Sequence, residues 1–319
     1  MRIINNQQLI QAAGPLDFLS AMEKAFLVQE TGDFLMPDRI HAGYRGNVLL
    51  LMPAFYQKYF GTKLVSVFPD NHQNGENIIT GVMVLNDGTT GKPLAILDAT
   101  GLTAFRTAAV GALGIAYTTP KNVTSLGLIG AGTQGFHQAL FACVIRNINK
   151  LAVYDPYHPD LPAFVEKLHK NLPHVALSVK KDAPSLVQES EVIITATTSL
   201  RPVIPEDADM QGKHFIGIGS YKPEMREFPD TLYENLENLV IDTEQARTES
   251  GDVRIPLRNN LISNENVIRL GQLINGSKQL DVSGTTFFKT VGMALFDLMA
   301  AQMVYEKATE KGLGTIVNF

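Results

Sequence analysis

The chain has 319 residues, of which 45% are apolar and 18% are charged, and its formal net charge is −5. This composition is typical of a folded globular protein, and the length predicts two domains or one large one. The acidic balance, without a stripe of lysine and arginine, argues against a nucleic-acid partner. The single cysteine, Cys143, excludes an internal disulfide framework and a multi-cysteine zinc site, so we expect no metal centre.

The first residues predict no export signal. They lack the basic start, the apolar run and the small-residue cleavage site of a signal peptide. No window approaches the about 18 apolar residues of a membrane span, so we expect a cytoplasmic protein without a membrane partner. Cys143 lies in the apolar run ALFACVI, where a buried and unreactive thiol is expected.

The first third of the chain predicts a sheet preceded and followed by helices. The first helix is expected over residues 16–31. Segments with alternating apolar residues then follow at 48–56, 59–69, 79–87 and 92–100. Turn signals such as Asp87-Gly88 separate them, and this pattern predicts a largely antiparallel sheet. A helix rich in small residues is expected over residues 102–117.

From about residue 120 onward, apolar strands alternate with helices. We expect strands at 124–129, 150–154, 176–179, 191–196, 214–218 and 238–241. Helices such as 134–148 and 161–171 lie between the first four of these strands. Strands that are apolar throughout and alternate with helices predict an α/β domain with a doubly wound parallel sheet, which we place at 118–290.

The end of the chain predicts one long amphipathic helix. The segment TFFKTVGMALFDLMAAQMVYEKATEKG has the pattern of such a helix, and Gly312 is well placed to stop it. We expect this helix to pack back on the first domain. That domain would then be a discontinuous α+β domain comprising residues 1–117 and 291–319.

The stretch SLGLIGAGTQGFHQAL, residues 125–140, predicts a dinucleotide-binding loop. Its glycines, Gly130, Gly132 and Gly135, have the G-x-G-x-x-G spacing, which alone is a weak signal. A strand before the loop, a helix after it and an acid, Asp155, at the end of the next strand strengthen the prediction. The alternative is a turn that uses glycine only for packing.

Each glycine of the loop has a physical task in dinucleotide binding. Gly130 permits the tight turn, Gly132 lets the backbone approach a pyrophosphate, and Gly135 lets the helix pack closely on the strand. Thr133 and Gln134 belong to the helix start, whose free N–H groups attract phosphate.

The second strand indicates which dinucleotide is bound. Asp155 can accept hydrogen bonds from the ribose hydroxyls and would repel a 2′-phosphate, so we expect NAD, with NADP still possible because His158 lies nearby. Thr197, in the run TATTS after the fourth strand, is a further candidate contact. A threonine that simply faces solvent at a strand end is the alternative there.

Three cations of the first domain stand in otherwise apolar runs. Arg39 lies in MPDRIHAG, Lys63 in YFGTKLVSVFPDN and Arg106 in LTAFRTAAVGALG. Arginines suit the grip on a carboxylate, and a lysine in an apolar pocket can have a lowered pKa and act on a carbonyl or imine nitrogen. The alternative reading is ion pairing with acids such as Asp38, Asp70 or Asp98.

The order of these segments resembles the ornithine cyclodeaminase/mu-crystallin family over nearly the whole chain. The resemblance is carried by MPDRIH, GTKLVSVFPDN, ILDATGLTAFRTAA, LGLIGAGTQGFHQAL, GIGSYKPEMREFP and FFKTVGMALFDL. It implies that Arg39, Lys63 and Arg106 hold the carboxylate and the amino or imino group of the substrate. It also implies NAD(P) as cofactor, a Rossmann domain, and an N-terminal domain that forms a homodimer through its sheet.

The segments GIGSYKP and FFKTVG supply the remaining residues that we expect to contact the cofactor, namely Gly219, Ser220 and Thr290. One of them departs from the family pattern. Ornithine cyclodeaminases carry an acid just after the glycines of this fifth-strand motif, where this chain has Ser220. Serine at neutral pH is not a useful base, and Glu224 or Glu227 could substitute.

We therefore expect an oxidoreductase that reduces a small cyclic imino acid, such as Δ1-pyrroline-2-carboxylate. Three alternatives stay open. The first is an ornithine cyclodeaminase, the second is an alanine-dehydrogenase-like or opine-forming enzyme, and the third is a crystallin-like binding protein.

Overall fold

The computed structural model describes residues 1–318, apart from the side chains of His72 and Asn74. The chain divides into two compact units. Unit 1 comprises Met1–Arg106 and Met293–Phe319, and unit 2 comprises Thr107–Gly292. The sequence predicts boundaries after residues 117 and 290, and the contacts divide the chain after Arg106 and Gly292. Unit 1 is thus built from both ends of the chain.

Unit 1 contains a seven-stranded sheet in the order β15-β1-β6-β5-β4-β3-β2. Strands β2 to β6 pair antiparallel with their neighbours, and β1 pairs parallel with β6, so the predicted largely antiparallel sheet is confirmed. The strands are β1 (Arg2–Ile4), β2 (Ile40–Tyr44), β3 (Asn47–Tyr56), β4 (Tyr59–Val67), β5 (Ile79–Asp87), β6 (Pro93–Asp98) and β15 (Thr315–Ile316).

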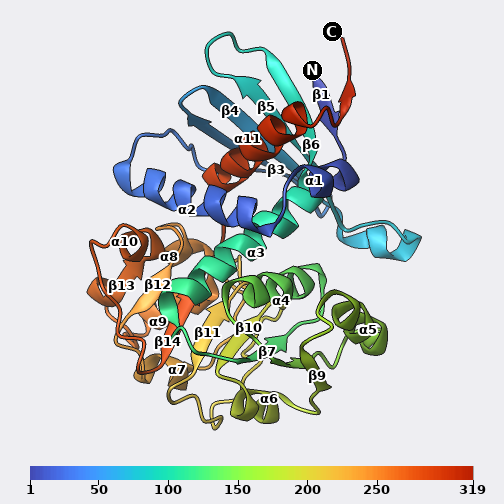
Figure 1. Cartoon of the computed structure of the whole chain (residues 1–319). Helices are drawn as coiled ribbons and strands as arrows, with labels where there is room; N and C mark the ends of the chain where they lie inside the picture. Colours follow the sequence, from blue (N-terminus) through green and yellow to red (C-terminus); the bar gives the residue numbers. More distant parts are fainter. Residues whose placement is uncertain (319) are drawn as a thin grey trace. The chain divides into compact units, whose positions relative to one another are not determined.

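Two long helices cover one face of this sheet. Helix α11 (Ala294–Glu310) packs against β3, β4 and β5 and lies beside α2 (Pro15–Thr31), as Figure 1 shows. The buried rings of Phe26 and Phe296 join the two helices edge to face, with centroids 4.8 Å apart. Helix α2 begins with a proline at its first position and ends at Gly32, whose φ of +71° favours glycine. The shorter elements are α1 (Asn6–Ala12) and the 3-10 helix η1 (Pro69–Asn74).

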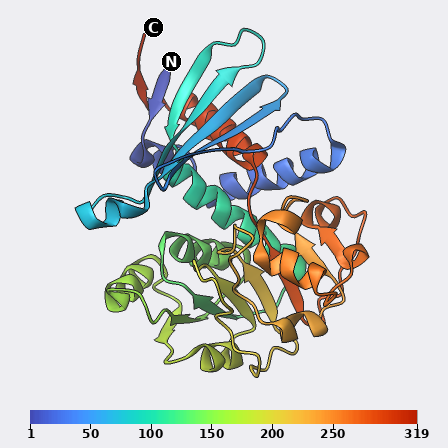
Figure 2. The same cartoon turned by 180° about the vertical axis from the view of Figure 1, so that it is seen from behind.

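The helices in the described part of unit 1 leave the opposite face of the sheet uncovered (Figure 2). Leu49, Phe55 and Val82 are 39%, 41% and 38% exposed. Met52 and Met83, which lie on the same strands, are buried. Successive side chains of a strand point to opposite faces, so the sheet is apolar on both sides.

Helix α3 (Ala99–Thr118) contains the boundary between the two units. Its length and hydropathy meet those of a membrane span, which corrects the expectation that no window would approach one. Of that window, 78% is buried inside the structure, as in a core helix. Small residues permit this burial, because a Cβ at Gly114 would lie 2.1 Å from the ring of Phe288.

Unit 2 contains an eight-stranded parallel sheet in the order β13-β12-β14-β11-β10-β7-β8-β9. The chain runs outward from β7 to β8 and β9 and then returns to the other side of β7 as β10. This reversal is the switch point of a doubly wound fold, so the predicted Rossmann sheet is confirmed. The strands are β7 (Ser125–Ile129), β8 (Lys150–Tyr154), β9 (Ala176–Val179), β10 (Val192–Thr195), β11 (His214–Gly217), β12 (Leu239–Ile241), β13 (Val267–Arg269) and β14 (Thr286–Lys289).

The helices of unit 2 are mostly short after the first two. They are α4 (Thr133–Ile145), α5 (Leu161–Asn171), α6 (Ala183–Glu189), α7 (Asp230–Glu234), α8 (Ala246–Glu249), α9 (Gly251–Arg258), α10 (Leu270–Ile274) and the 3-10 helix η2 (Asn264–Asn266).

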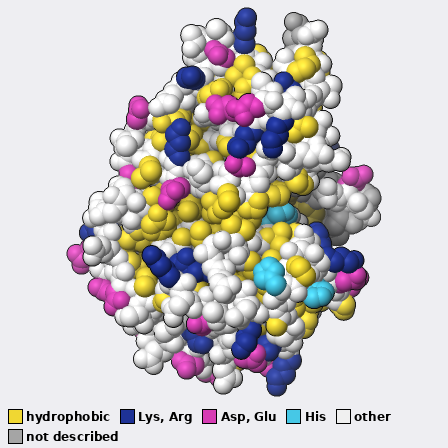
Figure 3. Space-filling view, viewed as in Figure 1, with side chains coloured by type: hydrophobic (Ala, Val, Ile, Leu, Met, Phe, Trp, Pro, Cys, Tyr) yellow, Lys and Arg dark blue, Asp and Glu magenta, His cyan; other side chains and the backbone are white. Residues whose placement is uncertain are grey.

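On the face that Figure 3 shows, lysine and arginine side chains are interspersed with acidic ones and do not form one continuous basic surface.

The predicted C-terminal helix is wrong at its beginning. Residues Thr286–Lys289 form β14 between β11 and β12, and α11 begins at Ala294 after its N-cap, Met293. A central parallel strand is apolar on both faces, so TFFK lacks the alternation that would distinguish it from a helix. The short strand β13 was likewise not predicted.

Candidate functional site

The glycine loop of unit 2 joins β7 to α4 and is held by the ends of two neighbouring strands. Gly130 has a φ of +101°, which glycine adopts readily, and its N–H donates to the carbonyl of Tyr154 at 3.1 Å. A Cβ at Gly130 would lie 2.7 Å from the carbonyl oxygen of Ala196. The loop therefore lies between β8 and β10, at the switch point of the sheet.

The start of α4 forms an open cradle that fits a pyrophosphate. Gly132 is the N-cap of the helix, no side chain caps it, and a Cβ there would meet nothing within 4 Å. A Cβ at Gly135 would instead lie 2.1 Å from the carbonyl oxygen of Gly130. Thr133 is exposed at the first turn, and the buried Oε1 of Gln134 has no hydrogen-bond partner within the described part of the chain. Free helix N–H groups with open access are suited to phosphate oxygens.

A cavity of about 860 Å³ extends over this loop. Its walls include Gly130, Gly132, Asp155 and Thr197, which are four of the predicted cofactor residues. The Asp155 carboxylate accepts hydrogen bonds from the N–H groups of Ala131 at 2.8 Å and Tyr157 at 3.0 Å. These bonds fix the carboxylate beside the glycine loop, where the ribose next to a bound pyrophosphate would lie. The cavity wall also includes His158 and Arg201.

A buried acid, Glu227, holds Thr197 of the cavity wall in place. Its carboxylate accepts hydrogen bonds from the N–H groups of Thr197 and Gly219, each at 2.8 Å, and of Ser220 at 3.2 Å. It also accepts from the Thr197 hydroxyl at 2.8 Å. Both oxygens therefore join the loops after β10 and β11. Glu227 is fully buried and both of its oxygens accept hydrogen bonds, so this carboxylate links the two loops.

Ser220 lies inside unit 2 and its side chain is engaged there. Its hydroxyl donates to the carbonyl of Met225 at 2.7 Å and lies 2.9 Å from the hydroxyl of Ser250. The residue is 0% exposed, whereas Glu224 is exposed. Neither Glu224 nor Glu227 thus stands beside Ser220 as a free buried acid.

Thr290 is buried at the end of β14. Its hydroxyl donates to Oδ2 of Asp242 at 2.5 Å, and the same oxygen accepts the N–H groups of Val291 at 3.0 Å and Gly292 at 2.7 Å. Asp242 thereby fixes the segment that leaves the sheet towards α11. Sequence reasoning did not assign this acid a role.

A buried lysine lies beneath the same strand ends. Lys289 donates from Nζ to the carbonyl of Gly217 at 3.1 Å. Burial lowers its pKa, and the carboxylates of Asp252, Glu227 and Asp242 oppose that effect. Lys289 and these three carboxylates form a buried cluster of charged groups in unit 2. The sequence analysis did not predict this cluster.

The structure brings together two of the predicted substrate residues in unit 1. Lys63 lies on β4 between Met52 and Met83 of the flanking strands and is 4% exposed. Its Nζ lies 2.7 Å from Oδ2 of Asp297, a fully buried residue of α11. Arg106 donates from Nε to the other oxygen, Oδ1, at 3.0 Å. One carboxylate therefore bridges two buried cations.

The charge of the third cation, Arg39, also acts on this cluster. Burial lowers the pKa of Lys63 to about 8; Asp297 opposes the shift, and Arg106 and Arg39 add to it. Burial would raise the pKa of Asp297, but Arg106 and Lys63 bring it below its ordinary value. The cluster thus consists of two buried cations paired with one carboxylate, and the charge of Arg39 also acts on it, so its net positive charge suits a small anion.

The ion-pair partner differs from the acids that the sequence offered. Asp38, Asp70 and Asp98 were the candidates, but Asp297 pairs with both Lys63 and Arg106. Asp98 instead accepts the N–H of Gly101 at 2.6 Å at the start of α3. The signal for Asp297 was present in the run ALFDLMAA, where an acid stands among apolar residues and calls for a partner.

Cys143 is half-buried, and burial raises the pKa of its thiol to about 11. A thiol with so high a pKa carries almost no thiolate at neutral pH and is a poor nucleophile. Within the described residues, no group of three or more His, Cys, Asp and Glu side chains could hold a metal ion.

The doubly wound sheet and the glycine loop at its switch point define a Rossmann-type protein with a second, discontinuous unit that carries the cation cluster. Residues 7–312 match the ornithine cyclodeaminase/mu-crystallin family, and the chain belongs to that family. The resemblance in the sequence motifs is therefore confirmed.

Three individual proteins show which members of the family this chain is similar to. The chain is 33% identical to a Δ1-pyrroline-2-carboxylate reductase of Bacillus cereus over 86% of this chain and 85% of that one. It is similar to the structure of Thermococcus litoralis Δ1-pyrroline-2-carboxylate reductase in complex with NADH and L-proline. That match has a TM-score of 0.93 and 30% identity, and it covers 99% of this chain and 100% of the other. The chain is also similar to the structure of an archaeal alanine dehydrogenase dimer with bound NAD. That match has a TM-score of 0.91 and 28% identity, and it covers 100% of this chain and 99% of the other.

Proposed function

We propose that this protein uses NADH to reduce the C=N bond of a small cyclic imino acid, with Δ1-pyrroline-2-carboxylate as substrate and L-proline as product. The observation that carries the proposal is the cluster of Lys63, Arg106 and Asp297, because it offers positive charge in an apolar setting. A carboxylate next to a C=N bond needs such a site. The two similar reductases, at 33% and 30% identity, support this choice of substrate.

Each cation has a distinct role in the proposed reaction. Arg106 and Arg39 bind the substrate carboxylate, for which the planar guanidinium is well shaped. Lys63 hydrogen-bonds the imine nitrogen and donates the proton that this nitrogen needs. A pKa of about 8 suits this role, because the ammonium form is then present at neutral pH and still gives up its proton readily. The bound cofactor supplies the hydride that adds to the C=N carbon.

The cofactor assignment rests on the glycine loop. We propose that Gly130, Gly132 and Gly135, with the N-terminal turn of α4, hold the pyrophosphate and that Asp155 hydrogen-bonds the ribose. The open cradle at Gly132 and the fixed Asp155 carboxylate support this assignment. A 2′-phosphate beside Asp155 would be repelled, so NAD is preferred over NADP. Thr133, Gln134, Thr197, Gly219, Ser220 and Thr290 are the further proposed contacts.

A spectrophotometric assay tests the proposal directly. Five- and six-membered cyclic ketimine carboxylates are incubated with enzyme and reduced cofactor, oxidation is followed at the nicotinamide absorbance, and the product is identified by chromatography. We expect saturable reduction with NADH and the formation of L-proline from the five-membered ring. If neither ring is reduced with NADH or NADPH, the proposed activity is wrong.

An amino-acid dehydrogenase is the second candidate, because the similar alanine dehydrogenase covers nearly the whole chain. The same assay with pyruvate and ammonium separates it from the reductase. An ornithine cyclodeaminase is less well supported, since the Ser220 hydroxyl and both oxygens of Glu227 are engaged within unit 2. A crystallin-like binder would bind the dinucleotide without turnover of any of these substrates.

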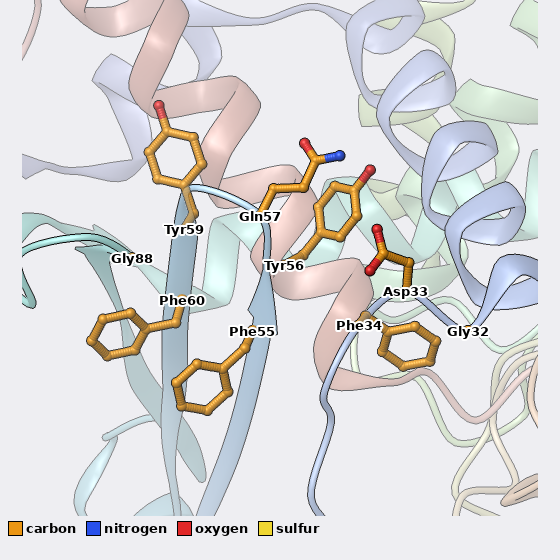
Figure 4. A pocket seen from close by; sticks show the side chains of 9 residues that line it. All are labelled: Gly32, Asp33, Phe34, Phe55, Tyr56, Gln57, Tyr59, Phe60 and Gly88. Carbon is orange, nitrogen blue, oxygen red and sulfur yellow. The ribbon is translucent and has the colours of Figure 1, made fainter.

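We further propose that the protein is a homodimer formed through the uncovered face of the unit 1 sheet. That face carries the exposed Leu49, Phe55 and Val82. Phe55 and Phe60 lie side by side on neighbouring strands of this sheet, as Figure 4 shows, and their rings stack with centroids 5.0 Å apart. Apolar area of this kind marks an interface, and the similar alanine dehydrogenase is described as a dimer. The cytoplasmic location stays a prediction from the sequence.

A further inference from the structure

We infer that Asp297 is the resident counter-ion of the substrate site, and that binding of a carboxylate there is coupled to uptake of a proton by Lys63. This inference rests on the proposed function, since it assigns the substrate carboxylate to the same cluster. It adds a positioning residue, Asp297, and a linkage between binding and protonation.

Asp297 is placed to orient both buried cations at once. Its Oδ2 lies 2.7 Å from Nζ of Lys63, and its Oδ1 accepts the Nε–H of Arg106 at 3.0 Å. The carboxylate comes from α11, the amine from β4 and the guanidinium from α3. All three residues are at most 6% exposed, so solvent does little to screen these contacts. One side chain therefore fixes where two cations from two other elements lie.

Before a substrate binds, one carboxylate of the cluster pairs with two buried cations. The charged groups that act on Lys63 are Asp297 from α11, Arg106 from α3 and Arg39 from the segment before β2. Its neighbours on the flanking strands, Met52 and Met83, are uncharged. Burial and both arginines favour the neutral amine, and Asp297 is the group that favours the ammonium. A buried cation needs a paired anion, and here the two buried cations Lys63 and Arg106 share one.

A bound carboxylate would supply the second negative charge. It favours the ammonium form of Lys63 and raises its pKa above the value of about 8 in the free protein. Between the free and the bound pKa, binding takes up a proton. Well below both values, Lys63 is already protonated and no uptake occurs.

The proton taken up is the one that the reaction consumes. As the C=N carbon gains the hydride, the nitrogen gains the proton of Lys63, and the N–H bond of the product forms while that of the ammonium breaks. The neutral amine of Lys63 then recovers a proton from water. Binding of the substrate carboxylate thus favours protonation of Lys63 before Lys63 donates its proton to the imine nitrogen.

Titration calorimetry of the full-length protein with NADH tests this coupling without turnover. The probe is pyrrole-2-carboxylate, a planar ring carboxylate that has no C=N bond to reduce. Titrations in buffers with different ionisation enthalpies give the number of protons taken up at each pH. We expect uptake with a maximum near or somewhat above pH 8 and almost none at pH 6. The Lys63→Met variant should take up no proton.

The matched variants separate positioning from simple stability. In Asp297→Asn, Lys63 loses the group that favours its charge, so we expect the uptake maximum to move down by about one pH unit or more. Asp297→Glu keeps the charge and should keep the maximum near that of the unmodified protein. The control is Asp17→Asn. Asp17 of α2 pairs at 2.9 Å with Lys307 of α11, the helix that carries Asp297, but this ion pair lies outside the cluster. It should leave the uptake unchanged.

Each outcome decides the inference. Absence of uptake in the unmodified protein, or a maximum that Asp297→Asn leaves in place, overturns it. If Asp297→Asn does not fold, uptake that persists in Lys63→Met overturns it instead. If pyrrole-2-carboxylate, L-proline and L-alanine all fail to bind, no carboxylate site exists there and the inference is wrong. If the probe binds with uptake but no ketimine is reduced, the coupling stands and the proposed function fails.

Discussion

Lys63 is the residue whose side chain should matter most for turnover. If it donates the proton to the imine nitrogen, Lys63→Ala should lower kcat/KM roughly 100-fold or more, the usual scale for a general acid. The ammonium is the active form and its pKa in the free protein is about 8, so kcat/KM should be highest below that pH and fall as the pH rises through it. Initial rates from about pH 6 to 10 measure both effects. A flat profile, or a variant with normal activity, would show that Lys63 only binds.

Asp155 should decide between the two nicotinamide cofactors. Its carboxylate is fixed beside the glycine loop by the N–H groups of Ala131 and Tyr157. Asp155→Ser removes the charge that repels a 2′-phosphate, so binding of NADH should weaken and the ratio of kcat/KM for NADH over NADPH should fall. Steady-state kinetics with each cofactor measure that ratio. The assignment is wrong if the unmodified enzyme uses NADPH at least as efficiently as NADH.

Ser220 separates imine reduction from ornithine deamination. Deamination needs a group that removes the proton of an ammonium before the hydride leaves, whereas an imine is already electrophilic. Ser220 is buried, and its hydroxyl donates a hydrogen bond to the carbonyl of Met225. The carboxylate of the neighbouring Glu227 accepts hydrogen bonds from backbone N–H groups. We therefore expect little or no ammonia from L-ornithine in an enzyme-coupled ammonia assay, under conditions that give rapid ketimine reduction. Robust ammonia release would overturn the reductase proposal.

Single residues differ in how much of their role the sequence reveals. Lys63 and Arg106 could be found because a cation in an apolar run is rare and needs an explanation. The sequence also marks Asp297 as an acid in an apolar run and predicts that its helix returns to the first domain, but which cations it meets there is set by the packing of α11 on the sheet. Glu227 was beyond prediction, because its partners are N–H groups on two loops that the sheet brings together.

The loop between β7 and α4 allows two matched glycine variants. Gly135→Ala places a Cβ 2.1 Å from the carbonyl oxygen of Gly130, so the loop must move. We expect loss of dinucleotide binding together with a lower melting temperature of the protein. Gly132→Ala meets nothing within 4 Å, so the fold should stay intact while the added methyl group blocks the approach of the pyrophosphate. Thermal unfolding and NADH fluorescence titrations distinguish the two effects.

The opposite pattern would contradict the proposed cradle. If Gly132→Ala binds NADH as tightly as the unmodified protein, the pyrophosphate does not approach the backbone there. If Gly135→Ala keeps full stability, the close contact between α4 and the loop is not needed for the fold.

Elements were predictable where periodicity or turn residues mark them. Strand β5 and helix α5 have the bounds that the pattern predicts, because alternation and a helical repeat are unambiguous there. Strand β14 was missed because its run TFFK is apolar on both sides and continues into the apolar face of α11. Only the pairing with β11 and β12 shows it to be a strand, and that pairing is not encoded locally.

At the scale of the whole molecule, the uncovered face of the unit 1 sheet predicts a homodimer. Val82 lies on this face and is 38% exposed. Val82→Asp would bury an unpaired carboxylate twice in a symmetric interface, at a cost of about 3–5 kcal/mol for each charge, so the two charges together weaken association by at least about 10,000-fold. We expect the unmodified protein to have twice the mass of the chain and the variant to dissociate on dilution. The control is Val179→Asp, since Val179 is 53% exposed on the edge strand β9 of unit 2. Light scattering coupled to size exclusion measures the masses, and a folded, active monomer of the unmodified protein would refute the dimer.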